Sequence, residues 1–373
     1  MVIIQRKDFD SLLSALQKRN YVIMGPSIKD GAIMYDEIRS VSDFPVGWTD
    51  EHEKSRYRLK RRDDAALFGY TVGPQSWKKF LFPPLAKILT VVKRGKAMEI
   101  KLDSSKEIPP RYAFFGVRSC ELNAITIQDK VFNKDQFCDP SYNARRKNVF
   151  IIAVNCTESG GTCFCDSMNT GPGVKKGYDI ALTEVVKENV HYFTAEVGSD
   201  KGNEVLKDVP HKKAEASEVE AALELVDSAR KKMGRTIDTE GLKELLVDNL
   251  ENPHWDEVAH RCLMCANCTL VCPTCFCSTV DDVTDLSGEH AERWRRWDSC
   301  FTMDFAKVTG GNFRLSPKAR YRQRVTHKFS SWVDQFGTLG CVGCGRCITW
   351  CPVGIDITAE VQAIRSNGVR SDA

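Results

Sequence analysis

The cysteines of this chain have a regular spacing that suits the binding of a metal cluster. Two copies of one pattern stand near the C-terminus, and each reads C-x2-C-x2-C-x3-C-P, the run that holds [4Fe–4S] clusters in two-cluster ferredoxins. Three closely spaced thiolates reach one cubane from a single loop, whereas the fourth cysteine leaves that loop and reaches the neighbouring cluster. The pattern therefore predicts electron transfer. The copies are Cys262, Cys265, Cys268 and Cys272, and Cys341, Cys344, Cys347 and Cys351.

We expect the two copies to exchange their last ligands. Zinc sites favour two CxxC pairs separated by a longer loop, and disulfide frameworks suit short secreted chains, so neither alternative fits this spacing. One cluster is then expected at Cys262, Cys265, Cys268 and Cys351, and the other at Cys341, Cys344, Cys347 and Cys272.

A second group of cysteines lies in the N-terminal half, at Cys120, Cys156, Cys163 and Cys165. The first two follow predicted strands, and open sheets place ligands at the carboxyl ends of their strands. Glycines around the TCFC segment allow its loop to wrap a bound group. These four cysteines are expected to hold a third [4Fe–4S] cluster; the alternative is a set of buried, inert thiols.

The remaining cysteines and one basic run are less easily interpreted. Thr-Cys-Phe-Cys recurs with Cys275 and Cys277, which either pack beside the cluster, the interpretation we favour, or form a redox-active pair. Cys138 and Cys300 stand alone in the sequence and are expected to be structural. The basic run 318–328 either balances the charge of thiolate-bound clusters or forms a solvated helix face.

Composition narrows the class of protein. With 373 residues, the chain is long enough for two or three domains. Its net charge of +3, from 53 basic and 50 acidic residues, gives no reason to expect nucleic acid or an anionic membrane as partner. We find no apolar run of membrane-spanning length, and the charged start MVIIQRKDFD is unlike a signal peptide. We therefore expect a cytoplasmic protein without membrane insertion.

The elements that position these cysteines fall into two parts. Residues 1–210 are expected to form a mixed α/β domain, and residues 211–373 an α-helical dicluster ferredoxin domain, with the boundary near 200–215; the fold class is thus α+β. Helices are expected at 7–18, ELNAITIQDKVF, HKKAEASEVEAALELVDSARKKMG, TEGLKELLVDNLENPHWDEVAHR, WRRWDSCFTMDFAKV, YRQRVTHKFSSWVDQF and 357–366. Gly234 is expected to cap the third of these helices at its C-terminus. Asp356 is expected to cap the last helix at its N-terminus, and Gly368 lies beyond its end. Strands are expected at YVIMGP, GAIMYDEI, AMEIKLD, RYAFFGV, NVFIIAVN and a hairpin at 179–197.

Several segments together resemble a known family. RYAFFGVRSCELNAI, VNCTESGGTCFCDSMNTGPG, CLMCANCTLVCPTCFC and CVGCGRCITWCPVGIDI are similar to the 4Fe-4S dicluster electron-transfer subunits, which include sulfhydrogenase β subunits and one of the subunits of anaerobic sulfite reductase. The resemblance spans roughly residues 55–365. It implies a hetero-oligomer in which this chain relays electrons between a flavin subunit that handles NAD(P)H and a catalytic subunit, such as a [NiFe] hydrogenase or a reductase.

Two other functions compete with a relay. A self-contained enzyme with a flavin in the N-terminal half is one, but the chain has no G-x-G-x-x-G fingerprint, P-loop or G-x-S-x-G elbow. A redox sensor is the other, and it would need a DNA-binding element that no basic segment provides. The relay is therefore the expected function, and no catalytic residue is predicted.

Overall fold

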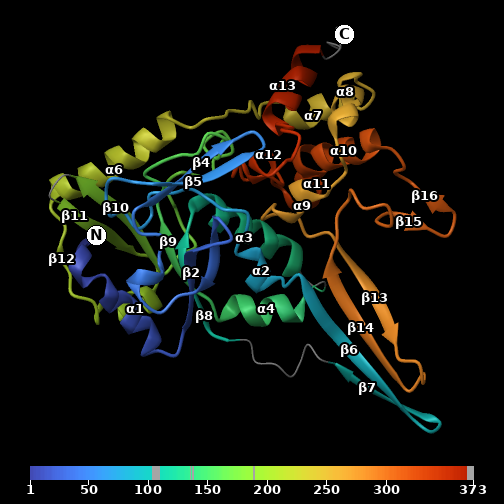
Figure 1. The fold of residues 1–373 in the computed structure, drawn as a ribbon, viewed down its shortest axis with the longest axis horizontal. Helices are drawn as coiled ribbons and strands as arrows, with labels where there is room; N and C mark the ends of the chain where they lie inside the picture. Colours follow the sequence, from blue (N-terminus) through green and yellow to red (C-terminus); the bar gives the residue numbers. More distant parts are fainter. Residues whose placement is uncertain (103–109, 135, 137, 188–189, 368–373) are drawn as a thin grey trace.

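A mixed eight-stranded sheet forms the centre of the N-terminal half (Figure 1). The computed structural model describes residues 1–102, 110–134, 136, 138–187 and 190–367. The strand order is β12-β1-β11-β10-β9-β8-β2-β3, in which β10, β9, β8 and β2 form a parallel series and the outer strands are antiparallel. The strands are β1 (Val2–Gln5), β2 (Val22–Lys29), β3 (Ala32–Glu37), β8 (Tyr112–Val117), β9 (Phe150–Val154), β10 (Ile180–Lys187), β11 (Val190–Val197) and β12 (Lys212–Lys213).

Helices cover both faces of this sheet because its strands alternate apolar side chains between two cores. Phe115 and Ile152 face a core closed by α1 (Asp10–Gln17) and α5 (Asp200–Leu206). Phe114 and Ile151 face the opposite core. That second face is covered by α2 (Lys78–Leu81), α3 (Ser119–Phe132), α4 (Pro140–Lys147) and α6 (Ala216–Lys231).

The structure confirms the predicted N-terminal elements: the first helix, the helix ELNAITIQDKVF, the strands and the β10–β11 hairpin, whose turn at 188–189 lies outside the described residues. One detail is wrong. Gly234 does not cap α6, which ends at Lys231; a Cβ at this glycine would lie 2.1 Å from the Gly161 carbonyl oxygen. Gly234 thus permits a close approach of two backbones.

The C-terminal half surrounds a separate core with short helices. Helices form around the two cysteine motifs as expected, but the helix predicted for TEGLKELLVDNLENPHWDEVAHR is divided into two at residues 249–253. Asp356 caps the last helix by accepting a hydrogen bond from the Thr358 N–H at 3.1 Å. Gly368 lies outside the described residues. The helices are α7 (Leu242–Asp248), α8 (His254–Arg261), α9 (Asn267–Leu270), α10 (Pro317–Thr326), the π-helical segment η5 (His327–Ser331), α11 (Trp332–Phe336), α12 (Arg346–Thr349) and α13 (Ile357–Asn367).

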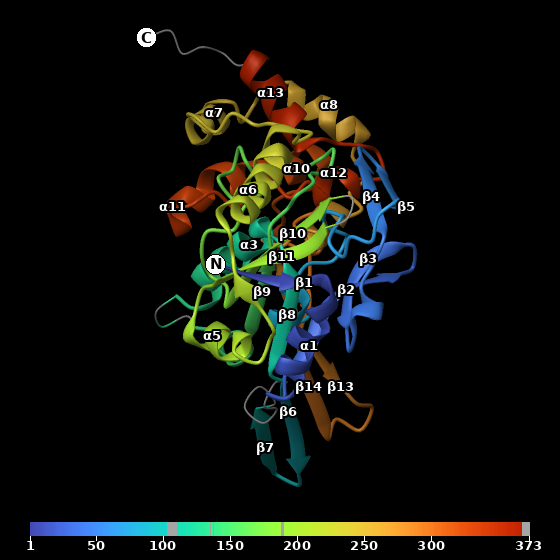
Figure 2. The same cartoon turned by 90° about the vertical axis from the view of Figure 1, so that its left-hand side faces the viewer.

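A four-stranded arm projects from the body in both ribbon views (Figures 1 and 2). The helix predicted for WRRWDSCFTMDFAKV is wrong, because its first residues belong to a strand of this arm. Alternating aromatic and charged residues suit a sheet, and pairing between strands overrides local helix propensity. The C-terminal half is therefore not purely helical. The arm strands, in order, are β13 (Ser278–Thr284), β14 (His290–Trp297), β6 (Leu85–Arg94) and β7 (Ala97–Leu102).

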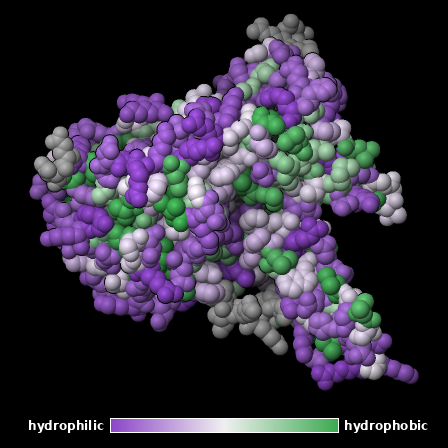
Figure 3. Space-filling view, viewed as in Figure 1, coloured by the Kyte–Doolittle hydropathy of each residue, from purple (hydrophilic) through white to green (hydrophobic). Residues whose placement is uncertain are grey.

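Because β6 and β7 come from the N-terminal half, the arm joins the two halves of the chain, and the division near 200–215 stays a prediction. The arm exposes hydrophobic residues among hydrophilic ones (Figure 3). None of the described helices has the length and apolar character needed to cross a bilayer. The remaining strands pair as β4 (Trp48–Glu53) with β5 (Arg56–Arg61), and β15 (Lys307–Val308) with β16 (Gly311–Asn312).

Candidate metal centres

The first candidate centre is a cavity lined by cysteines from both motifs. Its other walls are largely apolar and include Phe301, Tyr321 and Ile355. Negative charge on Cys351, from the second motif, helps to raise the pKa of Cys262 in the first motif, so the two residues lie near each other. The cavity thus brings together the thiols that the spacing predicts for one cluster, while their role as ligands stays a prediction. The cysteines that line it are Cys262, Cys265, Cys268, Cys347 and Cys351.

The second candidate centre adjoins the first. The charge of Cys272 influences the pKa of Cys341, Cys344 and Cys347, so these four thiols are neighbours. Cys347 also lines the first cavity. The loops that carry the two motifs therefore lie against each other, as the predicted exchange of the last ligands requires.

The third candidate centre lies where two parallel strands end. Cys120 follows β8 and Cys156 follows β9, and both line a cavity with Cys163 and Cys165 of the glycine-rich loop. The structure thus gathers the four cysteines proposed from sequence. Cys344 lines this cavity as well, so the third group lies beside the second.

Two glycines let the second and third groups approach closely. Gly343 and Gly345 have positive φ values of 63° and 73°, which L side chains rarely adopt. A Cβ at Gly343 would lie 2.5 Å from the Phe164 carbonyl oxygen, and one at Gly345 would lie 2.4 Å from the Thr162 carbonyl oxygen. The Phe164 N–H donates to the Gly343 carbonyl at 2.8 Å. Backbone contact therefore fixes the distance between the two groups.

Burial works against negative charge on these thiols. It raises the pKa values of Cys163, Cys268 and Cys341 to about 12. Thiolates become favourable there only when a bound metal or a cation compensates the charge. Each predicted set of four thiols matches the donor set of a [4Fe–4S] cluster. Among the described residues no three or more His, Cys, Asp or Glu side chains close on a single metal ion.

The basic run 318–328 supplies part of the compensating charge. Arg320, Arg324 and Lys328 recur every four residues, share one helix face and are buried. The Arg324 guanidinium donates to the Cys268 carbonyl oxygen at 3.4 Å, and Lys328 Nζ donates to Thr274 Oγ1 at 2.9 Å. Lys318 and Arg322 instead form salt bridges at the surface. The exposed face is thus solvated, whereas balancing of cluster charge by the buried face stays a prediction.

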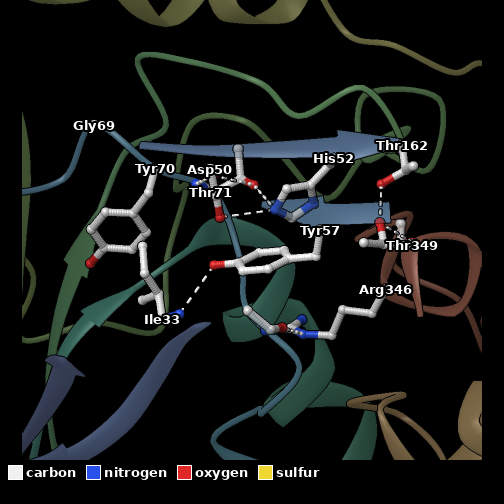
Figure 4. Close-up of polar contacts among 12 residues, drawn as sticks. Ile33, Asp50, His52, Tyr57, Gly69, Tyr70, Thr71, Thr162, Arg346 and Thr349 are labelled. Atoms are coloured by element: carbon white, nitrogen blue, oxygen red, sulfur yellow. Dashed lines mark hydrogen bonds and ion pairs between the residues drawn. The ribbon is translucent and has the colours of Figure 1, made fainter. Parts of the chain in front are cut away.

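A buried ion pair joins the second and third groups. Arg346, between Cys344 and Cys347, donates to Glu121 Oε1 at 2.6 Å, and both side chains are at most 1% exposed. Arg346 Nε also donates to the Gly73 carbonyl at 2.8 Å (Figure 4). Glu121 follows Cys120 in the chain, so the pair fixes both cysteine loops to one point.

A polar network that sequence reasoning missed supports the glycine-rich loop. His52 Nε2 lies 2.8 Å from Asp50 Oδ2, whose partner oxygen accepts from the Thr71 N–H at 2.9 Å (Figure 4). Burial opposes ionisation of Asp50, but His52 and Thr71 hold the pKa of its carboxyl below the usual value. A Cβ at Gly160 would lie 3.4 Å from both His52 Cγ and Cys163 Sγ. No motif marks these residues, because folding alone brings them beside Cys163.

Cys275, Cys277 and Cys300 form a further group. Cys300, which stands alone in the sequence, lines one cavity with Cys275 and Cys277, and its expected structural role stays a prediction. Cys138 is exposed and lies near Asn133 and Asn143, away from these groups.

Comparison with known proteins agrees with this arrangement. Residues 261–355 match the model of the 4Fe-4S dicluster domain. Over 347 residues the chain is 34% identical to sulfhydrogenase 2 subunit beta of Pyrococcus furiosus, covering 92% of each chain. No solved structure is significantly similar to the chain.

Replacing Arg346 with Met should lower the free energy of unfolding by about 3–5 kcal/mol, because Glu121 would remain buried without its cation. Adding Glu121→Gln should recover part of this loss, since the amide oxygen still accepts from Tyr35 and Trp77. Chemical denaturation of the metal-free chain measures both effects.

The matched control is Arg322→Met, which breaks a pair whose partner Glu251 is 81% exposed and should cost about 0–1 kcal/mol. Equal losses for Arg346→Met and the double variant would contradict the role given to the buried pair.

Proposed function

Since the chain belongs to the family of sulfhydrogenase beta subunits and is an iron–sulfur electron-transfer subunit, we propose that it relays electrons between two partner subunits. One partner is a flavin-containing NAD(P)H-binding subunit. The other is a catalytic oxidoreductase subunit, such as a [NiFe] hydrogenase or a sulfur or sulfite reductase. The proposal makes the chain one part of a hetero-oligomer.

The observation that carries this proposal is the continuity of the three cysteine groups. Cys344 belongs to the second group and lines the cavity of the third, while Cys347 belongs to the second and lines the cavity of the first. The three groups therefore form a row, with the second in the middle. Such a row suits the transfer of electrons through the protein better than the storage of electrons at one site.

The proposed ligands follow this row. When bound, each [4Fe–4S] cluster supplies a carrier of one electron whose potential depends on hydrogen bonding and solvent access. Apolar walls limit water, and Arg324, Lys328 and Arg346 offset thiolate charge. The ligand sets are Cys262, Cys265, Cys268 and Cys351; Cys341, Cys344, Cys347 and Cys272; and Cys120, Cys156, Cys163 and Cys165.

Anaerobically reconstituted protein should contain about twelve irons per chain, because three sets of four thiols each bind one cubane. Cys163→Ser should lower the content to about eight irons, whereas the exposed Cys138→Ser should leave it unchanged. Iron and sulfide assays measure this. About eight irons in the unaltered chain would remove the N-terminal cluster, and zinc alone would reject all three.

Exchange of the last ligands can be tested by thiol protection. In Cys268→Ser protein that has lost the first cluster, Cys351 should react with iodoacetamide while Cys272 stays protected, since each serves the cluster of the other motif. Peptide mapping by mass spectrometry locates the label. Labelling of Cys272 with protection of Cys351 would show that each motif keeps its own fourth cysteine.

Interrupting the middle of the row should stop coupled electron flow. In the assembled complex, Cys344→Ser should abolish NAD(P)H-driven reduction at the catalytic subunit but leave dye-linked activity at both ends intact. Cys138→Ser is the matched control. Full coupled activity in a Cys344→Ser complex shown to lack the second cluster would reject the relay, as would rapid NAD(P)H oxidation by the isolated, flavin-loaded chain.

A further inference from the structure

A cavity of about 550 Å³ lies outside the three cysteine groups and has cysteines of its own. Its volume falls in the range of small-molecule sites. Aromatic rings form much of its wall, and its cationic lining residues are Arg314 and Lys328. The cysteines in its wall are Cys275, Cys277 and Cys300.

The base of the β13–β14 hairpin brings two of these thiols together. Ser278 pairs with Trp297 at the end of the ladder, and the Asp298 N–H donates to the Cys277 carbonyl at 2.9 Å. Cys277 and Cys300 therefore leave the hairpin base close together, and both line the cavity.

The two thiols have unequal acidities. A hydrogen bond from Cys300 lowers the pKa of Cys277 to about 7 despite burial, and the positive charges of Lys328 and Lys78 act in the same direction. The same contact raises the pKa of Cys300. A thiolate beside a protonated thiol is the arrangement of a nucleophile and its resolving partner in thiol–disulfide exchange.

This pair lies next to the second candidate centre. Lys78 Nζ donates to the carbonyl oxygens of both Cys272 and Cys275 at 3.1 Å, and the charge of Lys78 also acts on Cys277. The π-helical segment η5 supplies His327 and Lys328 to the cavity wall. Such segments are rare and frequently occur at functional sites.

We propose that Cys277 and Cys300 form a redox-active dithiol that reduces small anionic disulfides bound in this cavity. The Cys277 thiolate attacks one sulfur of the substrate RSSR, which forms a Cys277–SR mixed disulfide and releases RS⁻. The Cys300 thiol then loses its proton and attacks Cys277 Sγ, which forms the Cys277–Cys300 disulfide and releases the second thiolate. Two electrons and two protons restore the dithiol, so the sum is RSSR + 2e⁻ + 2H⁺ → 2RSH.

The supply of these electrons rests on the proposed relay, but the exchange itself does not. The charge of Arg314 and Lys328 favours a substrate with carboxylates.

The test uses holoprotein with reduced thiols and oxidised clusters, freed of excess reductant, with dithiodiglycolate as the anionic probe and cystamine as its cationic counterpart. Each chain should consume one equivalent of dithiodiglycolate, release two thiols and acquire a Cys277–Cys300 link in the peptide map. Cystamine should react at least tenfold more slowly. Cys300→Ser should trap the mixed disulfide on Cys277, Cys277→Ser should not react, and Cys138→Ser should behave as the unaltered chain does.

Failure of the relay is distinguishable from failure of this site. Cys344→Ser protein should still form the Cys277–Cys300 link but should lose re-reduction of that link by electrons supplied through the partner subunits. Absence of the link in unaltered protein would overturn the proposal. Loss of iron in Cys277→Ser would also overturn it, because the thiol would then be a metal ligand.

Discussion

A buried thiolate needs a compensating charge, and this constraint shapes the centre of the molecule. Arg118, Arg324 and Arg346 are each at most 3% exposed, and each is influenced by the charge of a neighbouring cysteine. Arg346 in turn requires Glu121, since a lone buried cation would be costly. The ion pair therefore holds two cysteine loops together while it neutralises the region between them.

Much of the site could be predicted from sequence because cluster ligands occupy short, fixed spacings. The eight motif cysteines were recognisable from the C-x2-C-x2-C-x3-C-P spacing, and the N-terminal group from cysteines that follow strands such as β8 and β9. The structure gathers both groups, although ligation itself stays a prediction. Most of the sheet was also predictable, since its central strands are apolar runs, but the edge strand β12 and its neighbour β1 were not predicted.

Contacts between segments that are distant in the sequence could not be predicted from spacing or from apolar runs. WRRWDSCFTMDFAKV has local helical character, yet β14 forms because β6, some two hundred residues earlier, offers a strand to pair with. Cys300 looked isolated for the same reason: Cys277 reaches it only across the hairpin base. The Asp50–His52–Thr71 network carries no spacing signal at all, because the fold assembles it from two separate segments.

The β13–β14 hairpin of the arm brings the two cysteines of the proposed dithiol together, and an electron relay alone would not need this hairpin. Clusters carry single electrons, whereas reduction of an S–S bond takes two, so a site for that chemistry must lie close to a carrier and apart from its ligands. Lys78 satisfies the first condition, because it donates to the Cys272 carbonyl oxygen and its charge also acts on Cys277. The hairpin satisfies the second, because β13 leaves the cluster loop immediately after Cys277 and β14 returns just before Cys300. The segment between the two motifs thus carries the proposed two-electron site beside the proposed one-electron path and leaves the spacing of both motifs unchanged.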